Sequence, residues 1–532
     1  MAEEVFWVDK IAKEVIEREK HLNRGLKKYT CEMGLGASGI PHVGSAGDGV
    51  RSYVVYLALK KLGKNAEFIA FADDRDGLRK VPAGFPDSLE KDIGKPVSLI
   101  KDPFKCHKSF AEHMEAIIID AFKKIDVKFK FKRGHLEYAK GTFDSETIKI
   151  LTKAEETGRI IEETTNSTKF REGRLPFFPI CKKCGSIVTT HAYKFIPETK
   201  KILYKCDDEF VGKNSGTGKE ILVKGCGYEG ECGIRDGKLA WKVEFGARWS
   251  ALKINYEAYG KDLIESVRCN DRICKDILGF EPPVHSFYEF FTERSGKRIS
   301  KSAGNVFTVQ NWLKYASPES IRLLYLKKLS KTRVVDADSI PAYQDEVDEL
   351  AKIYFGEVKV KIPTDLTHFK RLYDYSYFLN PPKKKPILIQ YGVLANLMNL
   401  VRDKELVKQA LIKTGHIKRK LSAVQGKLLN EKLDNVNNWI QDTADVEEVK
   451  IKLNDLQKTA LHKIAYKLKE KDWKEDDLLQ EIYAIGKELN IQSGDLFRAA
   501  YLTLLKSERG PRLAQLILAI GRKKVAEIFE TV

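Results

Sequence analysis

The feature that most limits how this chain can fold is a strand–turn–helix–strand pattern near its beginning. Residues 27–33 have the composition of a short strand, and a glycine-rich turn follows at 34–39. A helical spacing of apolar residues comes next at 50–58, and residues 67–72 form a second strand. Two neighbouring parallel strands need a crossover connection, which is usually a helix, whereas a short hairpin turn joins antiparallel strands. The pattern therefore predicts an α/β fold built on a parallel sheet.

The glycine-rich turn carries a motif that suits phosphate binding. Residues 36–45 read G-A-S-G-I-P-H-V-G-S and lead into the predicted helix. Phosphates bind at helix N-termini, where free N–H groups and the helix dipole favour negative charge, and glycines let the backbone approach a nucleotide. His42 is placed to donate to phosphate oxygens. Alone, the motif also fits an ordinary strand-to-helix turn.

A second motif lies far along the chain, at residues 296–305, which read G-K-R-I-S-K-S-A-G-N. Arg298 and Lys301 bring two cations into a loop of small residues. Ser300 and Ser302 add hydroxyl donors. Such a loop can stabilise the charge that develops on the α-phosphate and on a leaving pyrophosphate. Alone, it also fits a solvated basic turn.

Together, in this order and with an insertion between them, the two motifs resemble the HIGH and KMSKS signatures of class I aminoacyl-tRNA synthetases. The resemblance implies that His42 and Lys301 bind ATP and stabilise the transition state of adenylate formation. Ser45 stands at the position of the second histidine, and Arg298 keeps the charge of the first lysine. The residues that the resemblance assigns to catalysis are His42, Ser45 and Lys301. Those it assigns to ATP binding are Gly39, Gly44, Arg298, Ser300 and Ser302.

Three further stretches narrow the resemblance. Residues 73–82 (D-D-R-D-G-L-R-K-V-P), 237–249 (G-K-L-A-W-K-V-E-F-G-A-R-W) and 507–514 (S-E-R-G-P-R-L-A) are similar to class I lysyl-tRNA synthetases of the archaeal type. The resemblance implies that lysine is activated with ATP and Mg²⁺ and is transferred to a lysine tRNA. Leu263 departs from the family, which has a histidine at this position. The resemblance also implies an amino-acid pocket lined by Gly34, Gly36, Trp241 and Tyr288.

The middle of the chain interrupts the alternation of strands and helices. A cysteine-bearing region with a polar hairpin pattern around 212–218 separates the first strands from renewed strand character at 238–245 and 286–291. Helical periodicity dominates from about residue 340. With the resemblance, this implies a Rossmann-type catalytic domain, a zinc-bearing insertion and an all-helical C-terminal domain that binds the anticodon. The predicted spans are 1–95 and 238–339 for the catalytic domain, 96–237 for the insertion and 340–532 for the helical domain.

The nine cysteines point to metal ligation or free thiols, because the chain shows no secretory signal pattern. Cys181 and Cys184 form a C-x-x-C knuckle, which places two thiolates on one tetrahedral zinc ion. Cys206 and Cys226 are expected to complete the site, with Cys232 as an alternative fourth ligand.

A second candidate metal site combines oxygen, sulfur and nitrogen donors, a mixture that suits zinc. Its residues are Asp102, Cys106, His107 and His113. On spacing alone, a loop with satisfied surface histidines is the better explanation, but similar residues bind zinc in the family that the chain resembles. The cysteines expected to stay unligated are Cys31, Cys269 and Cys274.

The chain is strongly basic, with a formal net charge of +18. This charge fits a polyanionic partner such as tRNA and fits a lysine-rich solubilising surface about equally well. The sequence has no signal peptide pattern and no apolar run of about 18 residues, so no membrane association is expected. A monomer in the cytoplasm is the expectation.

Two other functions remain in competition. The first is a HIGH-type ligase that adenylates another amino acid or a small amine; the long basic C-terminal region, which such an enzyme would not need, argues against it. The second is a catalytically silent tRNA-binding paralogue, which Leu263 suggests. Retention of His42 and Lys301 argues against a silent protein.

Overall fold

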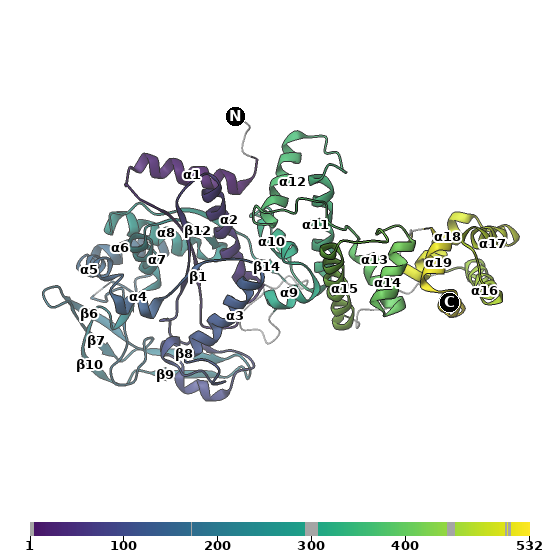
Figure 1. Cartoon of the computed structure of the whole chain (residues 1–532). Helices are drawn as coiled ribbons and strands as arrows, with labels where there is room; N and C mark the ends of the chain where they lie inside the picture. Colours follow the sequence, from purple (N-terminus) through teal and green to yellow (C-terminus); the bar gives the residue numbers. More distant parts are fainter. Residues whose placement is uncertain (1–4, 172, 293–306, 444–452, 506–507, 509–511) are drawn as a thin grey trace. The chain divides into compact units, whose positions relative to one another are not determined.

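The computed structural model describes residues 5–171, 173–292, 307–443, 453–505, 508 and 512–532. The chain divides into two compact units, and many of their helices and strands are labelled in Figure 1. The first unit comprises Met1–Gln310, Arg322–Asp336 and Val360–Pro381. The second comprises Asn311–Ile321, Ala337–Lys359 and Pro382–Val532. Across the described residues, every helix is too short or too polar to cross a membrane.

A five-stranded parallel sheet forms the centre of the first unit, with the strand order β13-β12-β1-β2-β4. Its strands are β1 (Tyr29–Leu35), β2 (Ala66–Ala72), β4 (Lys130–Arg133), β12 (Ile254–Gly260) and β13 (Val284–Tyr288). The inner strands are buried along most of their length, as expected for a parallel sheet that is covered on both faces. The predicted α/β fold with a parallel sheet is confirmed.

Helix α2 (Gly47–Lys61) connects β1 to β2 and packs against both strands and against α1 (Trp7–Leu22). A helix from much later in the sequence, α12 (Pro363–Ser376), belongs to the same unit. The guanidinium of Arg371 in α12 donates two hydrogen bonds, 2.8 and 2.6 Å long, to the Asp9 carboxylate in α1. The unit around the sheet therefore extends to Pro381.

The chain between β4 and β12 forms smaller sheets and helices. Strands β6 (His191–Ile196), β7 (Lys201–Cys206) and β10 (Tyr228–Gly233) make one antiparallel sheet. Strands β8 (Glu209–Asn214) and β9 (Glu220–Lys224) form the predicted hairpin. The helices are α4 (Gly134–Lys140), α5 (Asp144–Thr152) and α6 (Ala154–Thr165). The span 96–237 also contributes β4, so it supplies an edge strand of the main sheet.

The expected strand at 238–245 is wrong beyond its first residues. Strand β11 covers only Gly237–Leu239, and helix α7 runs from Trp241 to Leu252. Residues 242–245 alternate polar and apolar side chains, which is typical of a half-exposed strand. However, Lys238 and Glu244 are both buried and lie 2.6 Å apart, Nζ to Oε2. Two of the three polar positions in this stretch therefore form an internal ion pair and mark no solvent face.

Among its described residues, the second unit has helices and connecting loops but no strands, so the predicted helical C-terminal region is confirmed. Its apolar residues share one buried core that joins helices along the unit. Its full helices are α11 (Ile340–Tyr354), α13 (Tyr391–Val401), α14 (Lys404–Lys413), α15 (Ala423–Thr443), α16 (Asp455–Glu470), α17 (Glu475–Glu488), α18 (Ser493–Leu505), α19 (Leu513–Ile520) and α20 (Arg522–Glu530).

Candidate functional site

A cavity of about 300 Å³ opens at the carboxyl ends of the parallel strands, where ligands bind in open α/β sheets. The end of β1, the loop after β2, the end of β12 and helix α7 all contribute to its wall. Of the predicted residues, Gly34, Gly36, Ser45 and Trp241 line the cavity. Other lining residues important below are Asp48, Asp73, Asp76, Arg248, Glu257 and Leu263.

His42 lies at the start of the 3₁₀ turn η1 (Val43–Ala46), directly before α2. The backbone N–H of His42 donates to Ser45 Oγ (3.2 Å), and the Ser45 N–H donates to the His42 carbonyl (2.8 Å). A Cβ on Gly44 would come within 2.6 Å of the His42 imidazole, so only glycine leaves room for that ring. Tyr325 OH donates to the Val43 carbonyl at 2.6 Å. Two of the three predicted catalytic residues, His42 and Ser45, are thus held in one short, hydrogen-bonded turn.

Tyr288 does not line the cavity but is held by a buried arginine. The Arg51 guanidinium lies 3.8 Å from the centre of the Tyr288 ring, in cation–π geometry. Burial lowers the pKa of Arg51 to about 10, so the side chain still carries its charge at neutral pH. A Cβ on Gly47 would meet this guanidinium at 2.4 Å. The helix that follows the His42 turn therefore also fixes the orientation of Tyr288.

A buried group of charges forms one wall of the cavity. Arg248 in α7 is only 1% exposed and faces three carboxylates, from β1, the loop after β2, and β12. The closest N–O distances are 2.5 Å to Glu32, 3.0 Å to Asp73 and 3.5 Å to Glu257. Burial raises the pKa of Asp73 to about 7, and Arg248 opposes that rise. Burial also raises the pKa of Glu32. The negative charge that favours a cationic ligand is therefore supplied by Asp73 and Glu257, which line the cavity.

Sequence reasoning did not identify this group as part of the site. Asp73 and Arg248 lie in stretches 73–82 and 237–249, which carried the family resemblance, so a signal was present at those two positions. Glu32 and Glu257 lie inside strands and showed no distinguishing pattern. Of the predicted ATP-binding residues, Arg298, Ser300 and Ser302 lie outside the described residues, as does Lys301.

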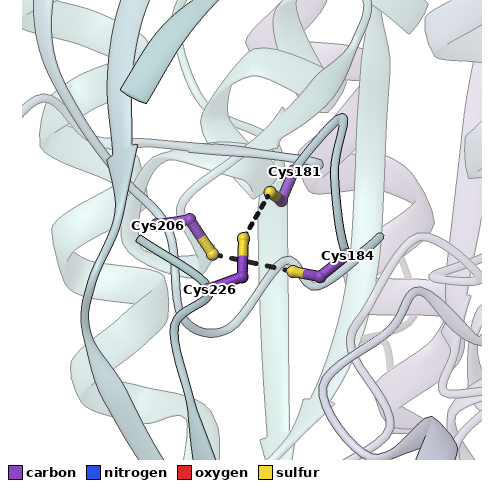
Figure 2. Close-up of side chains that lie close together, drawn as sticks. All are labelled: Cys181, Cys184, Cys206 and Cys226. Atoms are coloured by element: carbon purple, nitrogen blue, oxygen red, sulfur yellow. Dashed lines mark hydrogen bonds between the residues drawn. The ribbon is translucent and has the colours of Figure 1, made fainter. Parts of the chain in front are cut away.

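Four cysteines converge in the insertion (Figure 2), with ligand atoms all within 4.8 Å of one another. Cys181 Sγ lies 3.6 Å from Cys226 Sγ, and Cys184 Sγ lies 3.7 Å from Cys206 Sγ. Thiolates about 2.3 Å from a tetrahedral zinc ion would be about 3.8 Å apart, so the four sulfurs fit that ion. Cys232 lies outside the group, within β10 and paired with Ile202. The geometry therefore favours Cys226 over Cys232 as the fourth ligand.

Two glycines shape the turns that present these thiols. Gly185 and Gly227 have φ angles of 75° and 74°, a left-handed conformation that other residues rarely adopt. The Gly185 N–H donates to the Cys181 carbonyl, and the Gly227 N–H donates to the Cys206 carbonyl, each at 2.9 Å. Each turn thus bends the chain back beside a ligand.

The second predicted metal group also comes together, just before helix α3 (Phe110–Lys124). Cys106 Sγ lies 3.1 Å from Asp102 Oδ2, 3.1 Å from His107 Nδ1 and 3.2 Å from His113 Nδ1. Four different donors around one point fit a single small cation. A third grouping, His191 with Asp207 and Asp208, is better explained as ion pairing, because Arg174 binds both oxygens of Asp208 at 2.8 and 2.7 Å.

Comparison with known proteins places these features in a family. Residues 5–377 match the family model described as tRNA synthetases class I (K). A lysine–tRNA ligase from Cenarchaeum symbiosum (strain A) is 38% identical over 524 residues, covering 98% of this chain and 97% of that protein. A lysine–tRNA ligase from Rickettsia prowazekii is 31% identical over 511 residues, covering 94% and 91%. One from Haloarcula marismortui is 28% identical over 549 residues, covering 98% and 96%.

Proposed function

We propose that this chain, which belongs to the class I tRNA synthetases (K), is a lysine–tRNA ligase. The lysine carboxylate attacks the α-phosphorus of ATP, giving lysyl-adenylate and releasing pyrophosphate. A terminal hydroxyl of the tRNA then attacks the adenylate carbonyl, and AMP leaves. The observation that carries the choice of amino acid is the acidic cavity at the carboxyl ends of the sheet.

The cavity suits lysine in both charge and shape. Asp73 and Glu257 face the cavity with a surplus of negative charge around Arg248, which attracts the ammonium groups of lysine. Trp241 and Leu263 offer apolar surface to its four-carbon stem. Leu263, where the family has histidine, therefore supplies packing rather than a polar contact.

ATP binding falls to the turn before α2 and to the basic loop at 296–305. His42 and Ser45 donate to the phosphates, and Gly39 and Gly44 let the backbone approach them. Lys301, with Arg298 and the loop serines, stabilises the charge that moves onto pyrophosphate. Magnesium, bound with ATP, would neutralise phosphate oxygens.

Lysine binding is expected to strengthen as pH rises through about 7, the pKa of Asp73. Below that pH Asp73 is protonated in the free enzyme and attracts an ammonium group less; above it the full negative charge is present and affinity levels off. Measuring the lysine KM in ATP–pyrophosphate exchange from pH 6 to pH 8 tests this, with the ATP KM as reference. The Asp73→Asn variant should show a higher and flatter KM; an unchanged slope in that variant would exclude Asp73 as the cause.

Replacing Lys301 with alanine is expected to slow adenylate formation by about 100-fold or more, because one preorganised charge-stabilising donor is lost. Pyrophosphate exchange with each amino acid, with and without tRNA, tests the reaction and the role together. Lys297→Ala is the matched control, since it removes a neighbouring lysine with no assigned role. Exchange with a different amino acid would favour the other-substrate ligase, and no exchange at all would favour the silent paralogue.

The helical region, 340–532, is the proposed anticodon-binding domain, supported by its all-helical fold and the basic charge of the chain. Because α12 packs against α1, a truncation should end at Pro381 rather than at Ile340. We expect the shortened chain to keep lysine-dependent exchange but to lose charging of tRNA. Charging at the full-length rate would remove the anticodon role from residues 382–532.

Zinc is the proposed ion of both metal groups. In the four-cysteine group it would fix the antiparallel sheet of the insertion, a structural role. In the Asp102 group it would tie the loop before α3 to that helix through His113. The reaction belongs where translation occurs, so we place the chain in the cytoplasm, as a monomer.

A further inference from the structure

A second buried group of charges lies beside the Arg248 group and has its own cation. Lys238 in β11 has a side chain only 5% exposed. Its ammonium lies 2.6 Å from Glu244 Oε2 in α7 and donates a hydrogen bond to the Asp76 carboxylate in the loop after β2. Lys238 thus joins β11 and the adjacent helix α7 to the loop after β2, which lies 162 residues away in the sequence.

The position of Lys238 is itself tightly held. Tyr138 OH donates to Glu244 Oε1 at 2.9 Å and accepts from the Leu239 N–H at 2.9 Å. Arg75, next to Asp76, donates to the Gly237 carbonyl at 2.6 Å, immediately before Lys238. The loop after β2 and strand β11 are therefore bound together by both a backbone contact and an ion pair.

Asp76 and Lys238 differ in what they can reach. Asp76 lines the cavity and keeps 33% of its side chain exposed, whereas Lys238 is not among the lining residues. Asp76 lies near enough to Asp73 for the two negative charges to repel each other. Without a cation beside it, the partly exposed Asp76 carboxylate would therefore turn toward solvent. Lys238 offsets this repulsion from behind the cavity wall, and the neighbouring carboxylates in turn raise its pKa against the effect of burial.

We propose that Asp76 binds an ammonium group of the amino acid and that Lys238 is a positioning residue that holds Asp76 toward it. This inference rests on the proposed lysine–tRNA ligase function. Lys238 acts through Asp76 and touches no substrate. The buried ammonium of Lys238 can orient the Asp76 carboxylate while Glu244 stays bound to Lys238 and Tyr138.

The test is a double-mutant cycle on the full-length chain, with lysine-dependent ATP–pyrophosphate exchange as the assay. Lys238→Met and Asp76→Asn should each raise the lysine KM by about 10-fold or more, the scale of a lost charged hydrogen bond, with the ATP KM unchanged. The double variant should raise the lysine KM no more than the single variant with the larger effect does. Lys238→Arg, which keeps the charge, should retain a lower lysine KM than Lys238→Met.

Lys242→Met is the matched control, because Lys242 lies four residues after Lys238, in α7, but pairs with Glu265 at 2.9 Å, and neither residue lines the cavity. Additive effects, or equal rises in the lysine and ATP KM values, would overturn the positioning role. If Lys238→Met does not fold, Asp76→Asn still decides: an unchanged lysine KM there overturns the proposal. Failure of the wild-type chain to exchange with lysine is a separate result that refutes the proposed function, and the cycle is then run with the amino acid it activates.

Discussion

Serine in place of both Cys181 and Cys184 is expected to release one zinc ion and to unfold the sheet of β6, β7 and β10. Structural zinc in small cysteine sites contributes about 10–16 kcal/mol of apparent binding free energy, more than the net stability of most domains. Without the ion, four thiols with facing sulfurs lose the bond that holds them together. Metal analysis by mass spectrometry and limited proteolysis of the 177–239 region give the two readouts.

The chain offers a matched control for this experiment. Cys232 is fully buried in the same sheet but lies outside the four-cysteine group. Cys232→Ala should therefore keep the full zinc content, while Cys226→Ala should lose the ion. The zinc assignment fails if the double serine variant retains as much metal as the wild type. The choice between Cys226 and Cys232 reverses if only the Cys232 variant loses it.

Arg248→Met is expected to destabilise the sheet-bearing unit by about 3–5 kcal/mol, the usual effect of leaving buried charges without their partner. The variant leaves the buried carboxyl groups of Glu32, Asp73 and Glu257 without their cationic partner. Protonation relieves them, so the loss should shrink as the pH falls and the carboxyls become neutral. Urea unfolding followed by tryptophan fluorescence at pH 5.5 and pH 8 measures both the loss and its pH dependence.

Arg235 provides the comparison for that variant. Its guanidinium binds the Asp144 carboxylate at 2.6 Å, but the side chain is half exposed. Solvent screens such a pair, so Arg235→Met should cost far less stability than Arg248→Met. Equal losses for Arg235→Met and Arg248→Met would mean that the buried group is not the source of the effect.

The parallel sheet could be predicted because its signal is local. A strand, a glycine turn, a helix and a second strand occur within one short stretch, and chain geometry then dictates parallel pairing. Three of the four cysteine ligands could also be predicted, and the fourth was left between Cys226 and Cys232. Gly225 and Gly227, on either side of Cys226, already favoured that cysteine over Cys232. The pairing of β7 with β10 separates the two, because Cys232 pairs with Ile202 and Cys226 lies in the turn before the strand.

The charge groups of the cavity could not be predicted for a related reason. Arg248 meets Glu32 and Asp73 only after β1, β2 and α7 have packed together, and no local spacing encodes that meeting. Packing of the same segments also explains why the strand predicted at 238–245 was wrong. There, Lys238 and Glu244 resembled the exposed face of a strand, although they neutralise one another inside the protein.

The strand order has a consequence for how the protein is made. Strand β1 lies between β2, which follows it closely, and β12, which is synthesised only after the whole insertion. The Thr30 N–H, for example, donates to the side chain of Asn255, 225 residues away, at 2.6 Å. As the chain leaves the ribosome, β1 and β2 can pair early, but the other edge of β1 has no partner until the insertion has been completed. An unpaired edge is a template for wrong strand pairing. A nascent chain stalled within the insertion is therefore the form of this protein that most needs a chaperone.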